Sequence, residues 1–213
     1  ATDRYLSWTL DNQINYNKTF GKHNLGVTLL QSASKYNKES GSESANAIPN
    51  ENFEWYNMGS VDITDAATYG AGMSTGMSEN QLASYMARIN YAYNDRYLLT
   101  VSGRYDGSSK FPKESRYGFF PSVSAGWNIA QEKFMESTQN WLGSLKLRAS
   151  YGMIGNQNVA AYSFIPTMAV NNKYNGWISN GNYVTAITSI PSLVSRNFTW
   201  EKVGTLDIGI DFS

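Results

Sequence analysis

Few residues in this 213-residue chain could carry out covalent or metal chemistry. Cysteine is absent and His23 is the single histidine, which leaves no material for a disulfide, a thiolate metal site or a histidine cluster. Asp106 and Gly107 open a short polar stretch, but the acidic spacing of a calcium loop does not surround them. No nucleophile–base pair or paired carboxylates stand out. We therefore expect no catalytic residue, no metal, no cofactor and no enzyme activity.

Charged residues instead recur at alternate positions, each flanked by apolar neighbours. The candidates are Arg88, Arg104, Asp106, Lys146 and Arg148. Two interpretations stay open for them. Their side chains line the path of a solute, or they form ion pairs with one another or with another part of the protein.

Six aromatic residues lie in stretches rich in Asn and Gly and are candidates for ligand binding. They are Trp55, Tyr56, Tyr69, Tyr174, Trp177 and Tyr183. A sugar ring can stack on such aromatic faces, while neighbouring Asn side chains bond its hydroxyl groups. The alternative is that these rings pack the loops against each other or against a partner protein.

The composition excludes two broad classes of protein. Charged residues make up 16% of the chain and the formal net charge is zero, whereas a nucleic-acid-binding domain usually carries a basic excess. No run of about 18 apolar residues exists, so no transmembrane helix is expected. Aromatic residues reach 14%, with 15 Tyr and 6 Trp, and rings of this kind suit the interfaces of a membrane.

The elements that would position these residues are β-strands. In residues 5–20, six of the eight even positions are apolar or aromatic and seven of the eight odd positions are polar. This period of two is typical of a strand with one apolar face. The pattern returns near residues 23–36, 83–93, 97–106, 122–129, 145–152 and 206–212. We predict an all-β fold, an antiparallel up-and-down meander of about seven long strands with little helix.

The predicted connections alternate in length. Tight turns are expected at 21–22 and 94–95, and a longer link at 131–143 is compatible with a short helix. Long loops are expected at about 37–79, 107–115 and 155–202, where Gly, Ser, Asn and Pro are frequent. Short turns at one end and long loops at the other are typical of an outer-membrane β-barrel. Alternation alone also fits a soluble barrel, but strand length, loop asymmetry and aromatic strand ends favour the membrane.

The stretch "NYAYNDRYLLTVSGRYDGSSKF…RYGFFPSVSAGWNIAQEKFM…WLGSLKLRASYGMIGNQ" resembles the barrel of SusC/RagA-type TonB-linked outer-membrane transporters. The family's motifs fall on residues 97–100, 104–111, 120–127, 145–152 and 155–157. The tail "FTWEKVGTLDIGIDFS" resembles the family's closing strand. Ser124, before Ala125, is a small departure. The motifs are collinear from about residue 85 onward, and residues 1–80 fit only in their pattern.

The resemblance implies a 22-stranded barrel with an N-terminal plug, of which residues 1–213 would be a segment lacking the plug and the remaining strands. It also implies a bacterial outer-membrane location and import of oligosaccharides or peptides. The partners it implies are a SusD-like surface lipoprotein, the TonB complex through the plug region, and outer-membrane lipid. The lumen-facing charges could then pair with the plug. A small complete outer-membrane barrel with an adhesin or structural role is the alternative.

Overall fold

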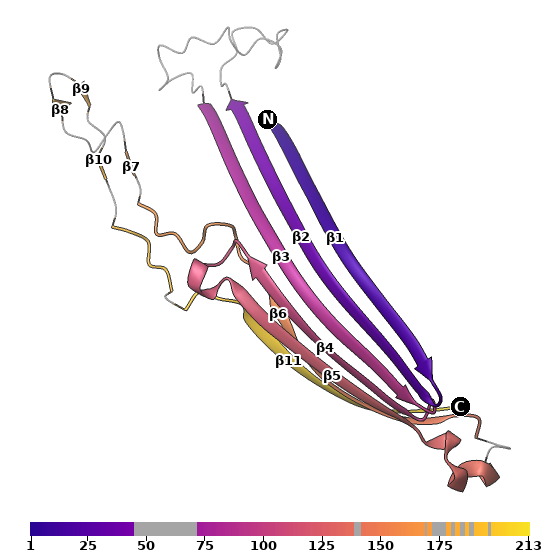
Figure 1. Ribbon diagram of the computed structural model, residues 1–213. Helices are drawn as coiled ribbons and strands as arrows, with labels where there is room; N and C mark the ends of the chain where they lie inside the picture. The colour runs from indigo at the N-terminus through magenta and orange to yellow at the C-terminus, as the bar shows by residue number, and fades with distance from the viewer. Residues whose placement is uncertain are drawn as a thin grey trace, which may run out of the picture. The chain divides into compact units, whose positions relative to one another are not determined.

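The computed structural model describes residues 1–44, 72–138, 142–168, 170–171, 178–179, 182–183, 186–187, 190–195 and 197–213. Seven strands form one sheet in the order β1-β2-β3-β4-β5-β6-β11. Their bounds are β1 Thr2–Phe20, β2 His23–Ser44, β3 Gly72–Tyr93, β4 Tyr97–Ser108, β5 Tyr117–Asn128, β6 Leu145–Asn156 and β11 Glu201–Phe212. The predicted antiparallel meander of seven strands is therefore confirmed (Figure 1).

Two strand pairs of two residues each lie between β6 and β11 in the sequence. Strand β7 (Val170–Asn171) pairs with β10 (Ala186–Ile187), and β8 (Ile178–Ser179) pairs with β9 (Asn182–Tyr183). Because these form separate small sheets, β6 and β11 remain direct neighbours, paired from Leu145–Phe212 to Asn156–Glu201.

Helical structure among the described residues is limited to three short 3-10 helices, η4 (Lys113–Ser115), η5 (Ile129–Gln131) and η6 (Lys133–Thr138). The last two follow β5, in the link where a short helix was compatible with the sequence, and lie at the same end of the strands as the C-terminus (Figure 1). Within the described residues, none of the helices has the length and hydropathy needed to cross a membrane.

Three turns and loops differ in how closely the sequence located them. Gly21, Asn94 and Asp95 have positive φ angles of 61°, 51° and 55°. Gly and Asn tolerate this backbone conformation best, and it suits tight hairpin turns, here of two residues between β1 and β2 and of three between the paired Tyr93 and Tyr97. The tight turns at 21–22 and 94–95 are therefore located correctly.

The prediction of a loop over the whole of residues 37–79 is wrong, because both ends of this range belong to strands. Strand β2 continues to Ser44 and β3 begins at Gly72. The end of β2, "NKESGSES", is polar or Gly at both odd and even positions, and the start of β3 has only Met73 and Met77 among polar residues, so neither carries a continuous alternating signal. A ladder needs only paired backbone groups, and the strands continue without a continuous apolar face.

The chain divides into two compact units, one of residues 1–9 and 34–80 and one of residues 10–33 and 81–213. In the first, Lys35 bridges Glu79 at 2.9 Å and Lys38 lies 5.3 Å from the centre of the Tyr5 ring. In the second, the buried hydrophobic residues are Phe111, Phe120 and Trp200. Such a small core means that the sheet itself has two open faces.

Candidate functional site

The sheet of the second unit has a polar face, which we define by cross-strand rows of hydroxyl and charged side chains. Thr100 lies opposite Ser124, Ser124 opposite Ser150, and Ser150 opposite Asp207. Residues directly opposite in an antiparallel pair share a face, so these residues all project from one side. Hydrogen bonds run across this face, from Thr100 to Asn90 at 3.0 Å and between Ser102 and Ser122 at 2.7 Å.

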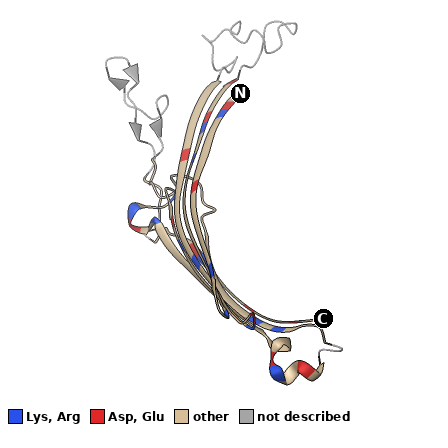
Figure 2. Ribbon diagram, turned by 45° about the vertical axis from the view of Figure 1, so that its right-hand side comes forward, with Lys and Arg blue, Asp and Glu red and all other residues tan. Residues whose placement is uncertain are grey.

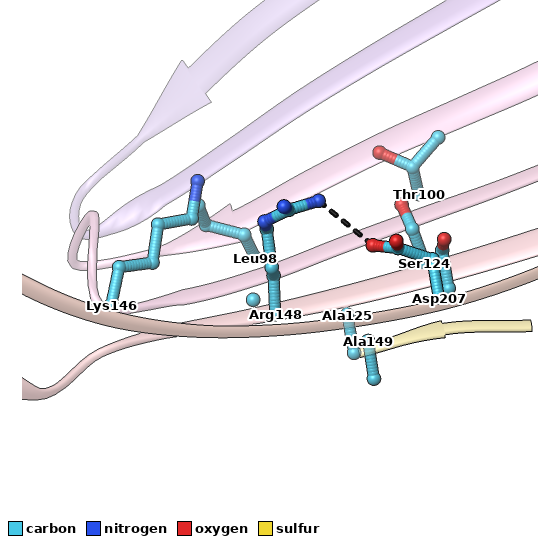
Figure 3. Close-up of a pocket in the computed structure, with 10 residues that line it drawn as sticks. Leu98, Thr100, Ser124, Ala125, Lys146, Arg148, Ala149 and Asp207 are labelled. Carbon is cyan, nitrogen blue, oxygen red and sulfur yellow. Dashed lines mark hydrogen bonds and ion pairs between the residues drawn. The ribbon is translucent and has the colours of Figure 1, made fainter. Parts of the chain in front are cut away.

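The candidate functional site is a charged hollow of about 290 Å³ on this polar face. Figure 3 shows Lys146, Arg148, Thr100, Ser124 and Asp207 on one side of the strands, with Ala125 and Ala149 pointing away on the other. Lys146 and Arg148 come from β6, and the aspartates that face them, Asp207 and Asp211, come from β11. The antiparallel register brings Arg148 opposite Gly209, between the two aspartates.

Arg148 forms ion pairs with both aspartates. Its Nη1 lies 2.8 Å from Asp207 Oδ1 and its Nε lies 3.5 Å from Asp211 Oδ1. About half of each of these side chains is exposed, which makes the pairs weak contributors to stability, about 0–1 kcal/mol each. Groups that are charged, paired and still hydrated suit an aqueous surface over which polar solutes pass.

A second ion pair on this face, between Arg104 and Asp106, is more buried. Arg104 Nε donates to both carboxylate oxygens of Asp106 at 2.8 Å, and its Nη2 donates to Ser84 Oγ at 3.1 Å. Asp106 and Ser84 are both buried. A buried carboxylate needs such partners, and the bond from Arg104 to Ser84 links β4 to β3. Arg88 lies opposite Ser102 and hence on the same face.

The structure does not test the aromatic residues that the sequence suggests for ligand binding. Trp55, Tyr56, Tyr69, Tyr174 and Trp177 lie outside the described residues, and Tyr183 is placed in β9 by its backbone alone. Their role therefore stays a prediction.

Figure 2 shows charged positions sparse along the strands and recurring in the short helices after β4 and β5.

An aromatic cluster that the sequence analysis did not identify anchors the segment before β11. Trp200 lies 5.1 Å from Phe111 and 5.3 Å from Phe120, measured between ring centres. Its Nε1 donates to the Arg116 carbonyl oxygen at 2.8 Å, and Ser115 Oγ donates to the Phe198 carbonyl oxygen at 2.7 Å. This cluster therefore ties the β4–β5 loop to the residues that lead into β11.

Glycines make room for the cluster. A Cβ at Gly155 would lie 2.1 Å from the Phe120 ring, and one at Gly118 would lie 2.5 Å from it. Phe120 was hidden from an alternation argument because it takes the position of a polar-face residue, two before Ser122. The available signal was the combination of Gly118, Gly155 and an isolated Trp200 just before a strand.

At the other end of the strands, Glu132 fixes the helical link that follows β5. Its carboxylate accepts hydrogen bonds from Tyr97 Oη at 2.7 Å and Trp127 Nε1 at 3.1 Å, and it bridges Arg96 Nη1 at 3.2 Å. These bonds from Tyr97 and Trp127, with the adjacent Arg96 charge, hold the pKa of Glu132 below its ordinary value. Tyr97, Trp127 and Arg96 therefore stabilise the anionic form of Glu132.

The opposite side of the sheet, which we call the apolar face, carries no charged residue at the outward positions of β4, β5 and β6, or of β3 from Ala83 to Tyr93. Tyr91, Leu99, Ala125, Ala149 and Ile208 form one cross-strand row. Near the tight turns it is bordered by contacting rings, with His23 stacked on Phe20 at 5.2 Å and Tyr97 on Trp127 at 6.4 Å. An aliphatic surface bordered by amphipathic rings matches a membrane-facing surface.

Comparison with known proteins agrees with this architecture. A family model described as "TonB dependent receptor-like, beta-barrel" matches residues 1–213. TonB-dependent receptor P26 of Formosa agariphila is 37% identical over 209 residues, covering 97% of this chain. TonB-dependent receptor SusC of Bacteroides thetaiotaomicron is 40% identical over 136 residues, 63% of this chain.

Among solved structures, that of the RagAB peptide transporter superposes with a TM-score of 0.80 over 98% of this chain. Sequence identity is 22%, so this likeness speaks for the fold alone. The chain spans 20% of the length of the Formosa receptor, 13% of SusC and 22% of the RagAB chain. It therefore corresponds to a minor part of each relative.

Proposed function

Because the chain belongs to the TonB-dependent receptor-like β-barrel family, we propose that it forms part of the wall of an outer-membrane transporter. Its apolar face meets lipid and its polar face lines the aqueous interior. The observation that carries the proposal is the division of charge across a single layer of strands. Opposite faces of the same strands carry Arg148 with Asp207 on one side and Ala149 with Ile208 on the other.

Strand length supports the same placement. Strands β4, β5, β6 and β11 each have 12 residues. A tilted transmembrane β-strand needs about 9–11 residues to cross the hydrocarbon. Hydrogen bonding between neighbouring strands satisfies the backbone, which lipid cannot do.

The cargo of the transporter is an oligosaccharide or a peptide, and its partner is a SusD-like surface lipoprotein. The sequence resemblance to SusC/RagA-type transporters supports both statements, and the RagAB structure is described as that of a peptide transporter. The TonB complex would act through a plug region. The loop residues Trp55, Tyr56, Tyr69, Tyr174, Trp177 and Tyr183 contact the cargo or the lipoprotein.

In this proposal the charged residues of the polar face line the aqueous interior of the transporter. Arg104 with Asp106, and Arg148 with Asp207, pair locally and leave a hydrated, nearly neutral surface. Arg88 and Lys146 add positive charge to the same lining, and Asp211, which lies opposite Lys146, offsets part of it. A lining with so little net charge suits cargo that is polar without being strongly charged, since such cargo is neither repelled nor trapped.

The placement of the two faces is tested by cysteine labelling in the complete transporter. This chain has no cysteine, so single substitutions give labels that are specific within it. Ser124→Cys and Val123→Cys are adjacent in β5 and lie on opposite faces, which makes each the control of the other. A membrane-impermeant charged maleimide should modify Ser124→Cys at least several-fold faster. Equal rates, or faster reaction at Val123→Cys, would reject the proposal.

Transport itself is tested in a host whose own copy of the gene has been deleted. Cells expressing the complete gene should accumulate fluorescent oligosaccharides or peptides, and a protonophore should abolish accumulation because TonB action needs the proton gradient. Affinity purification of the tagged transporter should recover a surface lipoprotein. Accumulation that persists with the protonophore would contradict energy-coupled import.

A further inference from the structure

The apolar face contains a row of small residues that crosses three strands. Ala87 of β3 lies opposite Gly103 of β4, and Gly103 lies opposite Pro121 of β5. Two residues along each strand toward the loops, the same face carries an aromatic row of Tyr85, Tyr105 and Phe119. Two residues along toward the tight turns, it carries an aliphatic row of Ile89, Val101 and Val123. The small row is therefore a recess between an aromatic row and an aliphatic row.

The recess continues onto β1 and β2 as a hollow of about 450 Å³. Ile14 and Leu29 extend its aliphatic lining, and Asn12 and Gln31 stand at its border. Its aromatic wall is well packed, since Tyr105 stacks on Tyr117 with ring centres 5.0 Å apart. The Phe119 ring lies over Gly103, where an added Cβ would approach it to 2.9 Å. Glycine at position 103 thus makes room for the Phe119 ring that lines the hollow.

One polar pair interrupts this surface. Asn12 Nδ2 donates to Gln31 Oε1 at 2.6 Å. Within the described residues this is the single side-chain hydrogen bond of either amide, so each retains unused hydrogen-bonding capacity. In the sequence of β1, Asn12 stands between Leu10 and Ile14 in the apolar stripe. An amide facing hydrocarbon with unsatisfied groups is costly, and a ligand with a hydroxyl or carbonyl group would satisfy it.

We propose that this hollow binds one acyl chain of an outer-membrane lipid, and that the Asn12–Gln31 pair hydrogen-bonds a hydroxyl or carbonyl oxygen on that chain. The proposal rests on the proposed function, since it requires the apolar face to meet lipid. The methylene chain lies along the row of Ala87 and Gly103, against the Tyr85 and Phe119 rings.

Three features favour an acyl chain over a protein partner. No charged residue lines the hollow, so it offers nothing to a charged peptide or head group. Its volume lies within the ~300–1,000 Å³ of small-molecule pockets. A stable protein interface needs about 800 Å² from each partner, far more than a single recess supplies. The hollow is also continuous with the surface that we assign to the bilayer.

The first experiment places the complete transporter in nanodiscs of palmitoyl-oleoyl phosphatidylethanolamine. A small fraction of the lipid carries a photoactivatable diazirine on its acyl chain, and labelled peptides are identified by mass spectrometry. Peptides containing Ala87 and Gly103 should be labelled several-fold more than those containing Leu147 and Ile208. Ala87→Leu should remove this excess, because the added side chain fills the recess.

The matched control is Ala149→Leu, which makes the same change on the same face outside the hollow, opposite Ala125 and Ile208. It should leave the excess label unchanged. Even labelling over the whole apolar face would overturn the lipid site while leaving the membrane-facing assignment in place. Absence of label from every peptide of the apolar face would overturn the proposed function as well. A photoreactive residue substituted at Ala87 that crosslinks to a second transporter chain would show instead that another protein copy fills the hollow.

The amide pair is tested separately with two diazirine lipids that differ only in a 3-hydroxyl group on the labelled chain. The hydroxylated lipid should label the hollow several-fold better in the unmodified transporter. With Asn12→Leu and Gln31→Leu together, the two lipids should label equally, because the apolar lining remains. A preference for the hydroxylated chain that survives the double substitution would overturn the role of the amides.

Discussion

At the scale of single residues, the position of a residue in the alternation determines which face of the sheet its side chain occupies. It does not determine which side chain it bonds to. Arg88, Arg104, Lys146 and Arg148 share the polar face because they have the same parity as the hydroxyl residues around them. That much follows from a period of two. The bond from Arg104 to Ser84 and the double pairing of Arg148 with Asp207 and Asp211 depend on strand register, which a single strand's sequence does not contain.

The aromatic cluster could not be predicted for the same reason. Phe120 takes a polar-face position, and Trp200 precedes β11. Their contact arises only when the β4–β5 loop and the segment before β11 meet. Gly118 and Gly155 were visible in the sequence, but their function depends on a ring contributed by another strand.

Glu132 gives a prediction about pH. Its pKa is lowered in the folded protein, so its anionic form stabilises the link between β5 and β6 at any pH above the unfolded glutamate value of about 4.3. This contribution is lost as the pH falls through the lowered pKa. Hydrogen exchange of residues 129–138 in the complete transporter should therefore accelerate several-fold below pH 4, after correction for intrinsic rates.

Two substitutions test this assignment. Glu132→Gln removes the charge that Tyr97, Trp127 and Arg96 bind, so exchange should be faster at pH 7 and nearly independent of pH. Glu136→Gln changes the same residue type within η6 and serves as the matched control, with exchange like that of the unmodified protein. Unchanged exchange in Glu132→Gln would show that the link does not depend on this carboxylate.

At the scale of elements, the sequence predicts a strand only where its two faces meet different surroundings. Strands β4, β5, β6 and β11 separate apolar from polar residues over most of their length, and their ends were predicted to within five residues, with β5 and β11 beginning five residues earlier than expected. The end of β2, residues 37–44, is polar on both faces, and the start of β3, residues 72–82, has no continuous apolar face, with Met73 and Met77 separated by polar residues. In a transporter such ends would extend beyond the hydrocarbon, where strand pairing continues in water on both sides.

Trp200 allows a test of how the segment before β11 is held. Trp200→Ala removes a buried side chain that contacts Phe111 and Phe120, and should cost about 3–5 kcal/mol. Trp200→Phe keeps a ring and loses the hydrogen bond to the Arg116 carbonyl, about 0.5–1.5 kcal/mol. Denaturant unfolding of the complete transporter in detergent, with proteolysis between residues 157 and 200, measures both effects.

Phe134→Ala is the control for this series, because Phe134 is a large aromatic residue that is 65% exposed. It should change neither stability nor proteolysis. If Trp200→Ala behaves like Phe134→Ala, the cluster is not an anchor. If Trp200→Phe is as damaging as Trp200→Ala, the hydrogen bond to Arg116 matters more than the ring contacts.

At the scale of the whole molecule, the sheet has almost no interior. Phe111, Phe120 and Trp200 are its buried hydrophobic residues among those described, while Leu206, Ile208 and Ile210 are each more than 60% exposed. A soluble domain of this length buries most of its apolar surface. In the proposed membrane placement, the stability of this fold depends on hydrogen bonding between strands and on lipid against the apolar face.

The last prediction concerns a polypeptide of residues 1–213 alone. Strands β1 and β11 stand at the two ends of the sheet order, so each has one hydrogen-bonded neighbour in that sheet. An unpaired strand edge pairs readily with another chain, and an exposed apolar patch of this extent drives association. In detergent-free buffer the polypeptide should aggregate at micromolar concentration. Detergent should disperse it by covering the apolar face, although the edges stay unpaired. Multi-angle light scattering with and without detergent measures this, and a monodisperse monomer in plain buffer would contradict the assignment of the apolar face to lipid.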